Sequence, residues 1–335
     1  MEKKITIIGA GSFGSAIAQI FSDKKKEVLL YTIEEAQAEE INVNKTNKYY
    51  FEDLVFSNYV RATTSLSEAL SFSNYIIIAL PSSAVREISS KINKTIETPK
   101  IFINVSKGLE PGTNKMISEI MEEEIASSKI EGIVILSGPS HAEEIIKRDL
   151  TALVAVSLNN ELAKKVQLLF SNKYIRVYTS TDYIGVQIGA TVKNIIAIAS
   201  GIISGMGFGD NTRALLITRG LAEMVRYGRF KGARMETFFG LAGIGDLIVT
   251  ATSYHSRNFQ IGHKIGEGMD PKDALKDSKT IVEGVRAIEA VYFDAKDNSI
   301  EMPIIKALYK IFFEDQKIEK IMEEIINRDL KSETM

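Results

Sequence analysis

The chain has 335 residues, of which 45% are hydrophobic and 25% are charged, and its formal net charge at pH 7 is −2. This near-balanced charge supplies no overall basic field, which argues against nucleic acid or an anionic membrane surface as the main partner. The sequence contains no cysteine, which excludes disulfides, thiolate zinc sites and cysteine nucleophiles and suits a reducing, cytoplasmic environment. The length predicts about two domains.

The N-terminal stretch predicts a strand, a glycine turn and a helix in immediate succession. Residues 5–8 are a short apolar run, Gly9, Gly11 and Gly14 follow at G-x-G-x-x-G spacing, and residues 15–21 continue as a helix. This order indicates a dinucleotide-binding turn, with the pyrophosphate at the helix N-terminus, rather than a merely structural turn. The apolar run is too short for a signal peptide and is broken at once by glycine.

A second strand is predicted at residues 27–32, with Glu34 at its end, twenty residues past Gly14. An acid at this place would bind the 2′-hydroxyl of the adenosine ribose, although a solvated carboxylate at a strand end is an equally simple interpretation. Ile33 cannot bind a 2′-phosphate. Together these residues favour NAD.

Apolar strands then alternate with helices up to about residue 182. Strands are predicted at residues 75–80, 100–105, 133–136, 151–157 and 174–178, and helices at 35–42, 65–70 and 161–170. Several strands end at polar turns, among them Ser106-Lys107-Gly108. The alternation favours a parallel sheet covered on both faces, with ligands at the carboxyl ends of its strands. We therefore expect an α/β Rossmann-like domain over residues 1–182 and an all-helical substrate or catalytic domain over residues 183–335.

Lys193 is the only charged side chain between residues 183 and 209. No carboxylate lies three or four residues away, so the lysine must reach solvent, find a partner elsewhere in the fold, or lose its proton through desolvation. The last two properties are those of a general acid/base. A membrane span is the competing interpretation, but polar residues and glycines interrupt the window, which favours a buried core helix.

Asp246 is the second isolated charge, within the segment LAGIGDLIVTAT. An acid among glycines and aliphatic residues needs a charged or hydrogen-bonding partner, and Lys193 is the obvious candidate. A helix N-cap is the alternative role.

A phosphate site is predicted at Ser256, Arg257 and Asn258, which precede a helix-like segment. Combined with a nicotinamide cofactor and a proton-transferring lysine, this site indicates hydride transfer on a phosphorylated carbinol. The three histidines show no metal-ligand spacing, so no metal site is expected.

At this point the sequence resembles the bacterial-type NAD(P)-dependent glycerol-3-phosphate dehydrogenases. The resemblance spans nearly the whole chain and lies in motifs that occur in this order: GAGSFGSAIA (9–18), ALPS (79–82), SKGLE (106–110), SGPSHAEE (137–144), GVQIGATVKNIIAIASG (185–201), NTRALLITRGLAEM (211–224), GLAGIGDLIVTATS (240–253), SRN (256–258), VEG (282–284) and EMPI (301–304).

The resemblance implies interconversion of sn-glycerol 3-phosphate and dihydroxyacetone phosphate with NAD or NADP, by a cytoplasmic homodimer that supplies glycerol 3-phosphate for phospholipid synthesis. It implies Lys193 as proton acceptor, with Asp246 beside it and Lys107 in the catalytic site. By position, the substrate would be bound by Lys107, Gly138, Ser140, Lys193, Asp246, Ser256, Arg257 and Asn258. The dinucleotide would be bound by Gly9, Gly11, Ser12, Phe13, Gly14, Ile33, Glu34, Lys107, Ala142, Arg257, Ile281 and Glu283.

The chain departs from the family pattern at three places. Many relatives carry histidine or arginine where Ile33 stands, which counts against the usual NADP preference. His141 replaces a common phenylalanine and Ser106 replaces a threonine, and neither change removes a needed role. Two alternatives remain, namely a 3-hydroxyacid or ketopantoate reductase, which would not need the phosphate site, and a non-enzymatic dinucleotide sensor, which would not need Lys193.

Overall fold

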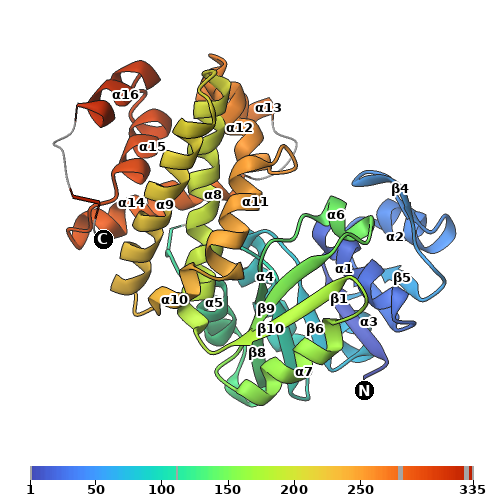
Figure 1. The fold of residues 1–335 in the computed structure, drawn as a ribbon. Helices are drawn as coiled ribbons and strands as arrows, with labels where there is room; N and C mark the ends of the chain where they lie inside the picture. Colours follow the sequence, from blue (N-terminus) through green and yellow to red (C-terminus); the bar gives the residue numbers. More distant parts are fainter. Residues whose placement is uncertain (1, 111, 278–281, 328–331, 334–335) are drawn as a thin grey trace. The chain divides into compact units, whose positions relative to one another are not determined.

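The computed structural model of the chain describes residues 2–110, 112–277, 282–327 and 332–333. It divides into two compact units. Unit 1 comprises Met1–Glu110 and Lys115–Tyr183, and unit 2 comprises Pro111–Asn114 and Ile184–Met335. Figure 1 shows a sheet with helices in unit 1 and a group of helices in unit 2.

Unit 1 contains an eight-stranded sheet with the strand order β10-β9-β8-β7-β6-β1-β2-β5. In chain order its strands are β1 (Lys4–Ile8), β2 (Glu27–Tyr31), β5 (Val60–Thr63), β6 (Tyr75–Ile78), β7 (Lys100–Asn104), β8 (Ile130–Ser137), β9 (Thr151–Val156) and β10 (Ile175–Ser180). β1 pairs in parallel with both β2 and β6. The chain thus moves outward from β1 to β5 and returns on the other side of β1, which creates a topological switch point between β1 and β6.

The sheet departs from the predicted all-parallel arrangement at β9, which pairs antiparallel with β8. The connection over residues 138–150 holds only the five-residue helix α6 (Ala142–Ile146), which is not a full crossover helix of the kind that joins parallel strands. β10 then pairs in parallel with β9. A second departure lies between the helices predicted at residues 35–42 and 65–70, where no strand was predicted. There β3 (Thr46–Asn47) and β4 (Phe51–Val55) form a small antiparallel pair.

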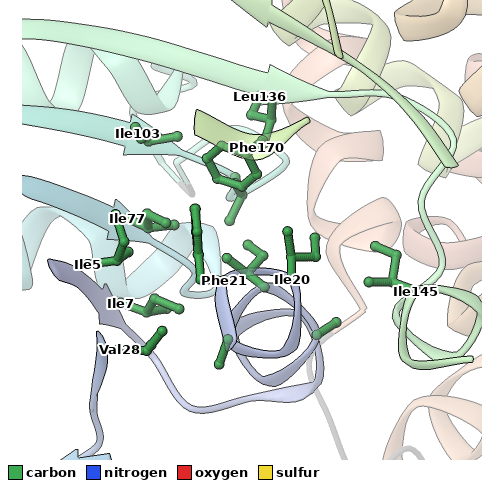
Figure 2. Packing of buried hydrophobic residues seen from close by; sticks show 14 of the residues in the cluster. Ile5, Ile7, Ile20, Phe21, Val28, Ile77, Ile103, Leu136, Ile145 and Phe170 are labelled. Atoms are coloured by element: carbon green, nitrogen blue, oxygen red, sulfur yellow. The ribbon is translucent and has the colours of Figure 1, made fainter. Parts of the chain in front are cut away.

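Helices cover the sheet of unit 1, and their apolar faces form its core. They are α1 (Ser12–Asp23), α2 (Glu35–Val43), α3 (Leu66–Phe72), α4 (Ser82–Thr95), α5 (Ile117–Glu124), α6, α7 (Asn160–Phe170) and the short 3-10 turn η1 (Ser127–Lys129). Phe21 of α1 meets Phe170 of α7 edge-to-face, with ring centroids 4.7 Å apart. Figure 2 shows these rings among buried aliphatic residues of β1, β6 and β7. This packing fixes α1, and with it the glycine turn, against the sheet.

Every regular element that the structure describes in unit 2 is helical. These elements are α8 (Tyr183–Gly205, whose first residue closes unit 1), α9 (Asp210–Phe230), α10 (Met235–Phe238), the π-helical turn η2 (Leu241–Gly245), α11 (Asp246–Thr252), α12 (Arg257–Gly266), α13 (Pro271–Asp277), α14 (Glu283–Asp297), α15 (Pro303–Phe313) and α16 (Ile318–Ile326). α8 runs among α9, α11 and α12 (Figure 1).

α8 is buried around its whole circumference, since every residue from Gly185 to Ile203 is buried. Glycines let α12 approach it closely, since a Cβ at Gly201 would lie 2.1 Å from the carbonyl oxygen of Phe259, and one at Gly262 would lie 2.1 Å from that of Ile198. By length and composition, Tyr183–Gly205 and Met235–Thr252 could each cross a membrane, but the first is entirely buried over its most apolar window. It is packed as a core helix, as the sequence indicates.

Candidate functional site

The glycine turn follows β1 at the switch point, and each of its glycines meets a different steric demand. Gly9 has a φ of +112°, and a Cβ there would lie 2.4 Å from the carbonyl oxygen of Ala79, just beyond β6. A Cβ at Gly14 would lie 2.0 Å from the carbonyl oxygen of Gly9. At Gly11 the nearest atoms belong to the Tyr50 ring, 4.0 Å away. The backbone at Gly11 can therefore be approached closely, and the turn fits the pyrophosphate of a dinucleotide.

Ser12 and Phe13 form the first turn of α1, and Lys107 comes to Phe13 from the loop after β7. The Lys107 Nζ lies 6.0 Å from the centroid of the Phe13 ring. A bidentate salt bridge holds this loop. Arg86 of α4 donates to both carboxylate oxygens of Glu110, at 2.6 and 2.7 Å. Those hydrogen bonds, with a further one to Glu124, hold the pKa of Arg86 above its ordinary value. Two residues that the sequence assigned to the cofactor are thus neighbours.

The turn after β8 carries Gly138, Ser140 and Ala142. Gly138 has a φ of +137°, and a Cβ there would lie 2.9 Å from the carbonyl oxygen of Ala152. The Ser140 hydroxyl donates to the Gly138 carbonyl at 2.9 Å. Ala142 is the buried first residue of α6, and His141 is its N-cap. Because β8 is parallel to β7, this turn lies at the same edge of the sheet as the Lys107 loop.

Ile33 and Glu34 lie between β2 and α2. Both side chains are exposed, and Glu34 is the N-cap residue of α2. The Glu34 backbone N–H donates to the Thr32 hydroxyl at 3.2 Å. This is the place expected for residues that contact an adenosine ribose, and their role there stays a prediction.

In unit 2, Lys193 and Asp246 form the ion pair that the sequence predicts. The Lys193 Nζ donates to the Asp246 Oδ1 at 2.5 Å, and the two residues are 3% and 1% exposed. α8 supplies the lysine and the start of α11 supplies the aspartate, so Asp246 has its partner across the helix interface. Gly189 of α8 permits this close approach, because a Cβ there would lie 2.5 Å from the carbonyl oxygen of Ala242 in the turn η2.

Thr250 completes the group and was missed by sequence reasoning. Its hydroxyl donates to the Asp246 backbone carbonyl at 2.6 Å and accepts from the Lys193 Nζ at 3.0 Å. The ammonium group is therefore held by two oxygens at once. The signal was the four-residue spacing from Asp246, which places the threonine on the same side of α11.

Ser256, Arg257 and Asn258 begin α12. Ser256 is buried and its hydroxyl accepts from the Phe259 N–H at 3.3 Å, so it is the N-cap of the helix. Arg257 is exposed at the first helical position, and the Asn258 Oδ1 accepts from the Gly284 N–H at 3.0 Å. Their role in phosphate binding stays a prediction.

Gly284 links this helix start to the lysine. A Cβ at Gly284 would lie 2.5 Å from the Asn258 Oδ1 and 2.7 Å from the carbonyl oxygen of Asn194, the residue that follows Lys193. The first turn of α14 therefore packs directly on both segments. Glu283 begins that turn, whereas Ile281 lies outside the described residues.

A glycine turn at a sheet's switch point and a buried lysine held by a carboxylate are the parts that dinucleotide-dependent hydride transfer at a CH–OH group needs. The fold and these groups therefore place the chain among the dinucleotide-dependent dehydrogenases. The protein-family model for the N-terminus of NAD-dependent glycerol-3-phosphate dehydrogenase matches residues 4–163. The family model for its C-terminus matches residues 182–323. The chain belongs to this family.

Similar proteins match this chain along nearly its full length. The NAD(P)+ glycerol-3-phosphate dehydrogenase of Staphylococcus epidermidis is 45% identical over 331 residues, which are 99% of this chain and 100% of the relative. That of Staphylococcus aureus is 44% identical over 330 residues, 98% of this chain and 99% of the relative. The crystal structure of a glycerol-3-phosphate dehydrogenase from Coxiella burnetii has a TM-score of 0.92 at 33% identity and covers 98% of this chain and 99% of its own. The predicted family and fold class are confirmed.

Proposed function

We propose that the chain catalyses reversible hydride transfer between sn-glycerol 3-phosphate and dihydroxyacetone phosphate, with Lys193 as the group that moves the hydroxyl proton. By its family the chain is an NAD(P)-dependent oxidoreductase that acts on a CH–OH group. The observation that supports the role of Lys193 is its burial in a contact with Asp246 and Thr250. A buried, oriented lysine of this kind is suited to general acid/base work.

The reduction needs a hydride at the carbonyl carbon and a proton at the carbonyl oxygen. A bound NADH or NADPH supplies the hydride. Lys193 gives its proton to the oxygen as the C–H bond forms, and the same lysine accepts the hydroxyl proton in the oxidative direction. Asp246 and Thr250 fix the direction of the ammonium group and stabilise its charge, so that no reorientation is needed during the reaction.

The phosphate end of the substrate would meet the start of α12. Arg257 is exposed there and can donate two hydrogen bonds to phosphate oxygens, while the positive end of the helix dipole favours an anion. The remaining assignments follow from position in the family. Ser256, Asn258, Lys107, Gly138 and Ser140 would contact the substrate, and Gly9, Gly11, Ser12, Phe13, Gly14, Lys107, Ala142, Arg257, Ile281 and Glu283 would contact the dinucleotide.

We further propose a preference for NAD over NADP, because Glu34 would accept from a free 2′-hydroxyl and repel a 2′-phosphate. The exposed Ile33 beside it offers no cation for that phosphate. In the cell, a homodimer in the cytoplasm would supply glycerol 3-phosphate for phospholipid synthesis.

The test is oxidation of NADH and, in parallel, of NADPH by purified protein with dihydroxyacetone phosphate, followed by the absorbance of the reduced cofactor. Unphosphorylated dihydroxyacetone is the substrate control. Arg257→Gln should raise the KM for dihydroxyacetone phosphate about tenfold or more, because a charge-assisted contact is lost. Lys264→Gln, which removes a partly exposed cation paired with Asp277 in the last turn of the same helix, is the matched control and should leave that KM unchanged.

Two results would contradict the proposal. Equal turnover of phosphorylated and unphosphorylated ketones would show that no phosphate site operates. Reduction of 2-keto or 3-keto acids in place of dihydroxyacetone phosphate would make the chain a hydroxyacid or ketopantoate-type reductase.

A further inference from the structure

A buried polar network lies directly behind the glycine turn. Asn47 of β3 is fully buried, and its amide donates to the carbonyl oxygen of Ala10 and to the hydroxyl of Ser15, both at 2.9 Å. Gln37 of α2 donates to the same Ala10 carbonyl at 2.9 Å and to the Asn47 Oδ1 at 3.2 Å. The Ala10 carbonyl thus receives two side-chain amides from the protein interior, one for each of its lone pairs.

This arrangement determines where the next N–H points. The carbonyl of Ala10 and the N–H of Gly11 belong to one planar trans peptide group, in which the C=O and N–H bonds point in opposite directions. Holding the carbonyl inward therefore turns the Gly11 N–H outward. Gly11 is the N-cap of α1, and its own carbonyl accepts from the Ser15 N–H at 2.9 Å. Its N–H is consequently presented at the positive end of the helix, where a phosphate binds.

The same network extends to the loop that carries Glu34. The Thr32 hydroxyl donates to the Gln37 Oε1 at 2.5 Å, and the Glu34 N–H donates to the Thr32 hydroxyl at 3.2 Å. Gln37 therefore joins the turn expected to bind the pyrophosphate with the loop expected to bind the adenosine ribose. An amide suits this task, because its NH2 group donates to Ala10 while its oxygen accepts from Thr32.

We infer that Gln37 and Asn47 are positioning residues for the dinucleotide, which fix the Gly11 N–H toward the pyrophosphate and hold the Glu34 loop in register with it. The inference rests on the proposed function only in taking the glycine turn as the cofactor site. It assigns no direct contact with the cofactor to either side chain. Removing the amide of Gln37 or Asn47 should therefore weaken cofactor binding far more than it slows the chemical step.

The main test replaces Gln37 by methionine, which keeps the length of the side chain and removes its amide. We expect the Kd for NADH, measured by calorimetry, to rise about tenfold, because one N–H to phosphate bond loses its orientation. The KM for NADH should rise in parallel. The kcat at saturating NADH and the KM for dihydroxyacetone phosphate should change by no more than about twofold.

The matched control is Asn42→Ala. Asn42 also lies on α2, and it exchanges two hydrogen bonds with the backbone of Ala62 in β5, at 2.9 and 2.8 Å. Its loss should lower the stability to urea without raising the Kd for NADH. An equal rise of Kd in both variants would mean that any loosening of α2 weakens binding, and would overturn the inference. An unchanged Kd in Gln37→Met would overturn it as well.

Calorimetry with NADH alone separates this inference from the proposed function. If the wild type binds NADH but reduces no dihydroxyacetone phosphate, the proposed function fails while the comparison of the two variants still decides the role of Gln37. Asn47→Asp supplies a second readout, because a carboxylate oxygen would replace the donating amide nitrogen and repel the Ala10 carbonyl oxygen. We expect it to raise the Kd for NADH more than Gln37→Met does, and a smaller rise would count against the network.

Discussion

Replacing Lys193 by methionine should destabilise unit 2 as well as stop turnover. The substitution keeps most of the side-chain volume and removes only the ammonium group. Asp246, which is 1% exposed, then remains in the interior without its charged partner, and the Thr250 hydroxyl loses a donor. Breaking a buried ion pair from one side is costly for this reason, whereas removing both charges is not.

The size of the effect has an upper limit. Asp246 can escape its buried charge by taking up a proton, which at pH 7 costs an ordinary aspartate about 4 kcal/mol, that is, about 1.4 kcal/mol for each of about three pH units. Keeping the charge costs about 3–5 kcal/mol. We therefore expect the free energy of unfolding to fall by about 3–4 kcal/mol. The double variant Lys193→Met/Asp246→Asn should regain most of this loss while remaining inactive.

The assay is urea unfolding, followed by far-ultraviolet circular dichroism of the helices. The single variant also has a characteristic pH dependence. When Asp246 takes up the proton, the folded variant binds one more proton than the unfolded variant. Its free energy of unfolding relative to the wild type should then rise by about 1.4 kcal/mol for each unit by which the pH is lowered from about 7 to about 5. Equal stability of the single variant and the wild type at pH 7 would refute the reasoning, because Asp246 would then need no charged partner.

Three further substitutions test the helical unit. Thr250→Val should lower the free energy of unfolding by about 1.5–3 kcal/mol, since the Lys193 ammonium loses a hydroxyl acceptor; no change in urea unfolding would contradict that contact. Gly284→Ala should cost about 1–3 kcal/mol and raise the KM for dihydroxyacetone phosphate, because its Cβ displaces Asn258; an unchanged KM would place Asn258 outside the phosphate site. Glu223→Gln should cost about 1–3 kcal/mol with unchanged kcat, because the buried carboxylate accepts from two N–H groups at the start of α15; a loss of kcat would give Glu223 more than a structural role.

The glycine turn and the Lys193–Asp246 pair could be predicted because each consists of residues that are unfavourable in an ordinary strand or apolar helix. Few structural arrangements make such residues favourable. Three glycines at fixed spacing after an apolar strand answer steric demands that the structure then shows at Gly9 and Gly14. A single charge on an otherwise apolar helix must find a partner, and the only acid in a comparably apolar segment was Asp246. Strong physical constraints on single residues are thus readable without the fold.

The features that were missed depend on contacts or pairing that sequence periodicity does not encode. β9 is a near-continuous apolar run that is buried on both faces, like its parallel neighbours, so its pattern could not reveal that it runs antiparallel to β8. The segment with β3 and β4 is polar and irregular, so nothing in its sequence marks Asn47 as a buried residue. Asn47 is buried because the small hairpin folds against the glycine turn. Thr250 looks like an ordinary helix residue until Lys193 reaches it.

The proton transfer proposed for Lys193 gives a reason for the buried pair in unit 2 that stability does not give. Two apolar side chains of similar volume would pack at the Lys193 and Asp246 positions with equal or greater stability, because they avoid the desolvation of two charges. The same holds for Thr250, whose hydroxyl is engaged with the pair. A fold gains little from such a group, but proton transfer to a developing alkoxide requires it to be buried, charged and fixed in direction. For that reason the double variant, stable but inactive, would be the clearest separation of what holds this unit together from what makes it an enzyme.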